Sequence, residues 1–170
     1  AQCTDANVNK VTETLFKKYT SVFDFANADL SELEQDIRSI GLYRNKAKNI
    51  IATCQKLISD FGGEVPDTME ELLTLPGTGR KTANLVLGDI YHKPAVVVDT
   101  HCSRVSQRIG LTKETTPEKI ELDLKKLVPP DYQLRLCHQM VYHGRALCSA
   151  RSPKCDICPV LPVCKYGSTN

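Results

Sequence analysis

Apolar residues recur at helical spacing along almost the whole chain, and this pattern constrains the fold more than any other feature. Over residues 8–19, 30–40 and 47–58 the apolar positions follow the period of an amphipathic α-helix. Gly41 and Gly62 follow two of these patterns at the position where a left-handed C-terminal cap is expected. The first part of the chain is therefore predicted to be helical.

A short helix is expected just before the middle of the chain. The spacing of a capping box occurs twice, at Asp67 with Glu70 and at Thr68 with Glu71. In a capping box, the side chain of each residue accepts a hydrogen bond from the backbone amide of the other at the start of a helix. Both alternatives predict a helix that reaches about Leu75.

The second half of the chain continues the helical pattern. Thr116 and Pro117 have the residue types of an N-cap and a first helical position, for a helix that ends at Leu127. Another helix is expected over residues 132–145. The only strand-like run, residues 95–98, is short and isolated, so β structure is at most marginal. The predicted fold class is all-α.

Composition places the chain among ordinary globular proteins, with 41% apolar and 25% charged residues in a length of 170. That length is compatible with one compact, bilobed unit. No run approaches the roughly 20 apolar residues of a membrane span, and residues 1–10 lack the features of a signal peptide. We therefore expect an intracellular protein outside the membrane. The net charge of +2 is too small to indicate a polyanionic partner, so any nucleic-acid site must be a local patch.

The eight cysteines are unevenly spaced. Four are scattered among apolar residues and are predicted to be small core residues. Four others crowd the tail within residues 148–164. The absence of a secretion signal argues against disulfides. The tail cysteines are Cys148, Cys155, Cys158 and Cys164.

Four thiolates can hold either a structural zinc ion or a [4Fe-4S] cluster. Zinc sites commonly contain two close pairs of ligands, whereas this tail has one, formed by Cys155 and Cys158. The spacing therefore favours an iron-sulfur cluster. Arg151 and Lys154 lie between the ligands, which predicts a basic loop against a phosphate backbone.

A glycine-containing turn over residues 75–81 separates two helical patterns. Gly77 and Gly79 permit positive φ and close backbone approach. Amide groups at the start of the next helix, together with its dipole, form an anion site that suits a DNA phosphate and does not read the base sequence. We expect Arg80 to contribute to this site. An ordinary helix-to-helix turn explains the composition equally well.

The segment LPGTGRKTANLVL, followed by AVVVDTHCSRV, resembles the helix-hairpin-helix motif and catalytic aspartate segment of endonuclease III and related DNA glycosylases. The resemblance extends from near Ala1 to Cys164 and includes IGLYRNKAKNII and the four-cysteine tail. It implies a helix-hairpin-helix glycosylase fold with a [4Fe-4S] cluster.

The resemblance also implies how the chain is organised. A mostly helical lobe is expected over residues 1–94, with the hairpin motif at about 68–92, and a cluster lobe over residues 95–170 that carries the catalytic aspartate. In the resembled family roughly one or two further helices precede the segment that begins here at Ala1. We therefore expect the N-terminal helices to be absent.

The resemblance assigns Lys81 as the nucleophile. A deprotonated lysine amine can attack the sugar C1′ atom, expel the base, and hold the sugar as a Schiff base from which β-elimination nicks the strand. Water can displace a base but cannot form the imine. Without the resemblance, a solvated lysine that contacts phosphate would be the better interpretation.

Asp99 is the second catalytic residue that the resemblance implies. Locally it is a good N-cap for the helical pattern that follows, and isolated aspartates at such positions are usually caps. Both roles are compatible, because a cap uses one carboxylate oxygen and orients the other. As a catalytic carboxylate Asp99 would stabilise positive charge on the sugar or move a proton. His101 is expected to support the site or contact phosphate.

The target base in a duplex must be extruded before either residue can reach it. The resemblance places the wedge that fills the gap at Leu42, and places at Gln2 the glutamine that reaches the orphaned base. The ordinary alternatives are a hydrophobic contact at a helix end for Leu42 and a frayed terminus for Gln2.

These expectations combine into a monomeric, bifunctional DNA glycosylase and AP lyase that removes oxidised pyrimidines. Its partner would be double-stranded DNA with a damaged base or an abasic site, in the cytoplasm or nucleoid if the source is bacterial. Two alternatives stay open. One is a glycosylase of the same fold that acts on mismatched or oxidised purines, and the other is a non-catalytic DNA-binding or electron-transfer iron-sulfur protein.

Overall fold

The computed structural model describes residues 3–168, and every regular element in that part of the chain is helical. The prediction of an all-α protein is therefore confirmed. The chain divides into two compact units, Ala1–Gly79 and Arg80–Asn170. This division lies within the glycine turn, whereas the lobe boundary expected after residue 94 stays a prediction. None of the helices in the described part is long and apolar enough to cross a membrane.

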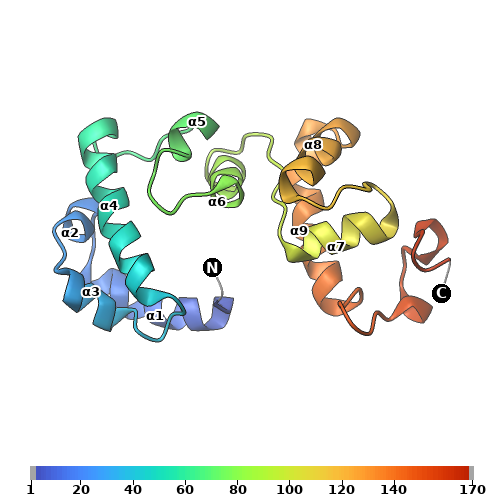
Figure 1. Ribbon diagram of the computed structural model, residues 1–170, viewed down its shortest axis with the longest axis horizontal. Helices are drawn as coiled ribbons and strands as arrows, with labels where there is room; N and C mark the ends of the chain where they lie inside the picture. Colours follow the sequence, from blue (N-terminus) through green and yellow to red (C-terminus); the bar gives the residue numbers. More distant parts are fainter. Residues whose placement is uncertain (1–2, 169–170) are drawn as a thin grey trace. The chain divides into compact units, whose positions relative to one another are not determined.

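The first unit is built around its longest helix. Helix α4 packs against α2 and α3 (Figure 1). A buried apolar cluster, which includes Leu15, Leu33 and Ala47, joins residues from α1, α3 and α4. The helices of this unit are α1 (Asp5–Lys18), α2 (Val22–Ala26), α3 (Leu30–Asp36), α4 (Tyr43–Phe61) and α5 (Met69–Leu72).

The helix predicted over residues 30–40 is α3 in the structure. Its predicted end is wrong, although its apolar residues are buried as expected. Helix α3 ends at Asp36, and Ile37 and Ile40 continue the pattern into the core from the following turns. These two residues keep the apolar spacing because they are buried in the core, although they no longer belong to the helix. Gly41 therefore caps no helix, and the left-handed residue is Leu42, with φ of 60° just before α4.

Of two other local predictions, the cap at Gly62 is confirmed and the capping box at the start of the next helix is confirmed only in its N-cap. Gly62 caps the end of α4 with φ of 63°. Thr68 begins α5, where its hydroxyl accepts a hydrogen bond from the Glu71 amide at 3.3 Å and donates one to the Glu71 carboxylate at 2.7 Å. Thr68 therefore caps the helix, but among the described residues the Glu71 carboxylate bonds to the Thr68 hydroxyl and not to the Thr68 amide, so the expected box is incomplete. Helix α5 ends at Leu72, earlier than expected.

The second unit has its own apolar core. Helix α7 packs against α9, and α8 also contacts α9 (Figure 1). Residues 95–98 form no strand, but all four are buried, and they anchor the chain directly before Asp99. The elements are α6 (Arg80–Leu85), the π-helix η1 (Val86–Ile90), α7 (Thr100–Ile109), α8 (Pro117–Leu127), α9 (Pro130–Ala146) and the 3-10 turns η2 (Cys155–Ile157) and η3 (Leu161–Val163).

The predicted helices of the second half are confirmed, with small differences at their ends. Helix α8 begins at Pro117, but Thr116 at its N-cap position makes no side-chain cap hydrogen bond. Helix α9 begins at Pro130, two residues before the start expected from the apolar pattern. Proline at the first position explains the early start, because its missing N–H is one that the helix leaves unpaired anyway.

The turn before α6 requires glycine at one of its two glycine positions. Gly77 has φ of 75°, and a Cβ atom there would lie 2.6 Å from Asn49 Nδ2. The turn is closed by the Thr78 amide, which donates to the Leu75 carbonyl at 3.1 Å. Gly79 has an ordinary φ, and a Cβ atom there would meet open space.

Replacing Gly77 with alanine should destabilise the fold, because left-handed backbone costs a residue with a Cβ about 1–2 kcal/mol and Asn49 must also move. Gly79→Ala is the matched control. We expect its free energy of unfolding to be unchanged or slightly higher, since alanine restricts the unfolded chain. Urea unfolding of both variants makes the comparison, and equal losses would contradict the assignment of the constraint to Gly77.

Candidate active site and four-cysteine loop

Asp99 is oriented by the helix that it begins. Its Oδ1 atom accepts hydrogen bonds from the His101 amide at 2.9 Å and the Cys102 amide at 2.7 Å. The predicted cap is therefore confirmed. Within residues 3–168 no hydrogen bond is made to its Oδ2 atom. One oxygen is thus fixed by the backbone of α7 and the other is available for chemistry.

Lys81 is the second residue of α6, and its side chain is exposed. None of the described residues forms a hydrogen bond or an ion pair with its amine. Asp99 is among these residues, so no such interaction joins Lys81 to Asp99. Both residues belong to the second unit and lie at the N-terminal ends of their helices. The amine is therefore accessible to a ligand.

Arg80, which sequence reasoning assigned to DNA, has a protein partner. Its Nη2 and Nε atoms donate to the two oxygens of Glu121 at 2.7 and 3.1 Å. The Glu121 side chain is only 4% exposed and also accepts from Lys125 at 2.7 Å. Glu121 lies on the apolar face of α8, and no sequence pattern connects it to Arg80.

His101 is held by Arg104, a residue that sequence reasoning missed. Arg104 Nη2 lies 3.0 Å from His101 Nδ1, and a guanidinium can only donate, so Nδ1 is the acceptor. A neutral His101 then carries its proton on Nε2. Arg104 also donates to the carbonyls of Gly144 at 3.1 Å and Cys148 at 3.0 Å. It therefore joins α7 to the start of the cysteine loop.

The other expected DNA contacts lie at the surface or outside the described residues. Leu42 is 55% exposed. Arg151 and Lys154 are exposed in the loop between the first two tail cysteines. Gln2 falls outside residues 3–168.

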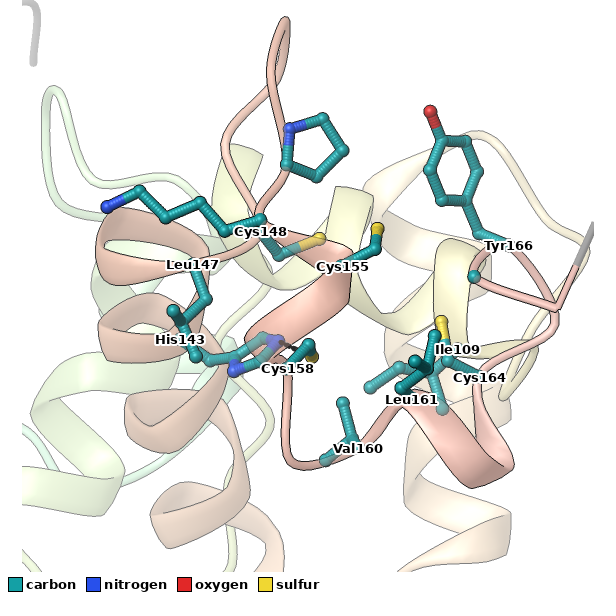
Figure 2. Close-up of a pocket in the computed structure, with 13 residues that line it drawn as sticks. Ile109, His143, Leu147, Cys148, Cys155, Cys158, Val160, Leu161, Cys164 and Tyr166 are labelled. Carbon is teal, nitrogen blue, oxygen red and sulfur yellow. Dashed lines mark hydrogen bonds between the residues drawn. The ribbon is translucent and has the colours of Figure 1, made fainter. Parts of the chain in front are cut away.

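All four tail cysteines line a single pocket. Figure 2 shows Cys148, Cys155, Cys158 and Cys164 around it, with apolar neighbours such as Leu161. Cys155 begins η2, Cys158 follows η2 and Cys164 follows η3, so the two short turns carry three of the thiols. The scattered cysteines differ in burial: Cys102 and Cys137 are buried as predicted, while Cys3 and Cys54 are half-buried.

The cysteine pocket fits a cluster better than a single ion. One zinc ion would need its four sulfurs about 2.3 Å from one centre. Among residues 3–168 no three side chains of His, Cys, Asp or Glu are close enough to share one metal ion. The four cysteines instead line one shared pocket together with apolar side chains such as Leu161. Thiols spread around such a space suit a multinuclear iron-sulfur group.

Arg108 holds the cysteine loop against α7, and sequence reasoning missed it as well. Its guanidinium donates to the carbonyls of Ser149 at 2.7 Å and Ala150 at 2.9 Å and contacts Cys148 Sγ at 3.4 Å. It also lies 4.5 Å from the ring centroid of Tyr166. The arginines of α7 therefore reach the loop from one helix face.

Comparisons with known proteins agree with this site. Residues 1–130 match the family described as HhH-GPD superfamily base excision DNA repair protein, and residues 148–164 match the iron-sulfur binding domain of endonuclease III. Endonuclease III of Synechocystis sp. is 53% identical over 96% of this chain and 75% of its own length. Endonuclease III of Bacillus subtilis is 48% identical over 98% of this chain and 77% of its own length.

A solved structure is similar over nearly the whole chain. A trapped endonuclease III–DNA covalent intermediate has a TM-score of 0.94 and 49% identity, and the match covers 99% of this chain and 80% of that one. The match to the iron-sulfur binding domain, over the residues that contain the four tail cysteines, shows that the cofactor is a [4Fe-4S] cluster. The chain belongs to the endonuclease III family of helix-hairpin-helix base excision repair enzymes, which are DNA glycosylases with AP lyase activity.

Proposed function

We propose that Lys81 is the nucleophile of both reactions. Its neutral Nζ atom attacks the sugar C1′ atom as the bond from C1′ to the base breaks, and the base leaves with a proton. The C1′–O4′ bond then opens, O4′ takes up a proton, and C1′ and the nitrogen form the Schiff base. Loss of a proton from C2′ then breaks the C3′–O bond to the 3′ phosphate by β-elimination. The observation that carries the proposal is an exposed amine with no partner among residues 3–168, on the second residue after Gly79. The covalent endonuclease III–DNA intermediate of the similar structure supports it.

Asp99 is proposed to serve the same reaction through Oδ2. A carboxylate whose other oxygen is fixed by two amides is already oriented before substrate arrives. It stabilises the positive charge that develops on the sugar, and it accepts a proton from the attacking amine. The backbone bonds to Oδ1 make this orientation independent of flexible side chains.

Several polar groups of the chain are each proposed to contact a phosphate of the DNA backbone. The open space beside Gly79 allows a phosphate to approach the turn closely, next to Gly77. His101 Nε2 and the exposed Arg151 and Lys154 provide further donors. Such contacts bind duplex DNA without reading its sequence.

The substrate is proposed to be an oxidised pyrimidine in duplex DNA, or an abasic site, bound by one copy of the chain. Leu42 would fill the gap left by the extruded nucleotide, and Gln2 would reach the orphaned base. Residues 1–94 and 95–170 are proposed to form the helical lobe and the cluster lobe. The relatives are bacterial, which supports action in the cytoplasm or nucleoid.

The cluster itself takes no part in the proposed bond changes. The four cysteines would hold it, and their attachment to one group would join the turns η2 and η3 and so fix the loop that carries Arg151 and Lys154. Its proposed contribution is the placement of this basic loop.

Lys81→Ala should abolish the covalent adduct that borohydride forms with an abasic duplex, because the variant lacks the amine that forms the imine.

Asp99→Asn should lower the single-turnover rate about 100-fold or more while stability stays close to wild type, since asparagine caps a helix as well as aspartate does. Asp99→Ala should lose the activity and also about 1 kcal/mol of stability. An active Asp99→Asn enzyme would contradict the catalytic assignment.

Leu42 offers a test in which stability and activity change in opposite directions. Leu42→Gly should raise the free energy of unfolding, because glycine adopts the left-handed φ of 60° without the cost of about 1–2 kcal/mol borne by leucine. It should also slow excision from duplex DNA, whereas cleavage at an abasic site in a single strand is unaffected. Leu42→Ala is the control, with slow excision and no gain in stability. Full duplex activity in both variants would exclude the wedge role.

Arg108 should control retention of the cluster. Arg108→Met removes the bonds that hold the loop carbonyls of Ser149 and Ala150, so iron-sulfur absorption should decay faster during dialysis. Arg151→Met, in the same loop but exposed, is the matched control and should keep the cluster. Equal retention in both variants would show that Arg108 is not needed to hold the loop.

A further inference from the structure

We propose that Arg80 and buried Glu121 form a positioning pair that fixes the start of α6, and with it the amine of Lys81. This inference rests on the proposed role of Lys81. It assigns Arg80 to a task inside the protein, in place of the phosphate contact expected from its position beside the glycine turn.

Helix α6 has little local means of holding its first residues in place. It contains only six residues, Arg80–Leu85, and the π-helix η1 follows at once, so the regular ladder of hydrogen bonds is short. Helices of this length depend on tertiary contacts for their stability. The orientation of Lys81 therefore depends on what holds its neighbours.

Arg80 provides that contact. Its guanidinium donates two hydrogen bonds to the two oxygens of Glu121, at 2.7 and 3.1 Å, in the forked geometry that only arginine can form. The bonds run from the first residue of α6 to the middle of α8. Lys81 follows Arg80 directly, so a fixed Arg80 restricts the backbone from which the Lys81 side chain extends.

Glu121 is built to keep this partner. It is 3% exposed as a residue, and its carboxylate also accepts from Lys125 at 2.7 Å. Burial opposes its ionisation, but hydrogen bonds from Arg80 and Lys125 outweigh burial and hold the pKa of Glu121 below its usual range. If Arg80 bound a phosphate instead, the buried Glu121 carboxylate would have only Lys125 as a partner. Removing one partner from a buried charge is destabilising. The pair is therefore favoured over the DNA contact.

Two variants test the pair from both sides. Glu121→Gln removes the charge that holds Arg80, and Arg80→Lys keeps the positive charge but cannot form the fork. Both should slow borohydride-trapped Schiff base formation on an abasic duplex roughly tenfold or more, the order expected for a displaced reacting group. The dissociation constant for a duplex with a non-cleavable abasic analogue, and its salt dependence, should stay at the wild-type values. Glu121→Asp should restore part of the rate.

Controls separate positioning from folding and from charge. Lys126→Met removes an exposed cation from α8, the helix that carries Glu121, and should leave both the trapping rate and the binding unchanged. Thermal unfolding and iron-sulfur absorption verify that each variant is folded. If Glu121→Gln fails to fold, Arg80→Lys still tests the proposal, because it leaves Glu121 beside a cation.

The outcomes that overturn the proposal are distinct. If Arg80 contacts phosphate, Arg80→Met weakens analogue binding and lowers the salt slope by about one, while Glu121→Gln does not. Wild-type trapping rates in both Glu121→Gln and Arg80→Lys would also overturn it. Lys81→Ala is tested in parallel: an adduct that survives it refutes the nucleophile itself, whereas an adduct that requires Lys81 but not Glu121 refutes only the pair.

Discussion

The two hydrogen bonds that Asp99 accepts from the backbone of α7 are the interaction on which the second unit most depends. They begin the helix, at 2.9 and 2.7 Å, directly after the buried residues 95–98. The same helix packs against α9 and carries the arginines that reach the cysteine loop. One carboxylate thus connects the core, the proposed chemistry and the cluster loop through a single element.

The cluster loop shows how a cofactor site is supported from outside its ligands. Arg104 bonds to the carbonyl of Cys148 and to His101, and Arg108 bonds to the carbonyls of the next two residues. Side chains beyond the ligands commonly orient a metal site in this way. Here they also attach the loop to the helix that Asp99 begins, so the cofactor and the proposed catalytic carboxylate share one support.

Features set by neighbouring residues were predicted from the sequence, and those set by distant ones were not. The cap at Gly62, the cap at Asp99 and the helix that starts at Pro117 follow from local residue types. The early end of α3 was missed because Ile37 and Ile40 stay buried after the helix stops. Apolar spacing therefore indicates which residues are buried, and a buried residue can lie in a helix or in a turn.

The residues of the site show the same difference between local features and features that depend on distant residues. Spacing alone singled out the four cysteines, and the resemblance to endonuclease III assigned roles to Lys81 and Asp99. The partners of Arg80 and His101 depend on contacts between helices, and no sequence pattern joins residue 80 to residue 121. A charged residue on the apolar face of α8 was the one available signal that Glu121 has a buried partner.

The most direct test of the account is to identify the amino acid that becomes bonded to DNA. The enzyme would be trapped with borohydride on an abasic duplex, digested with a protease, and the DNA-bearing peptide sequenced by mass spectrometry. The account predicts a single adduct on Nζ of Lys81. An adduct on another lysine, or one spread over several amines, would contradict it.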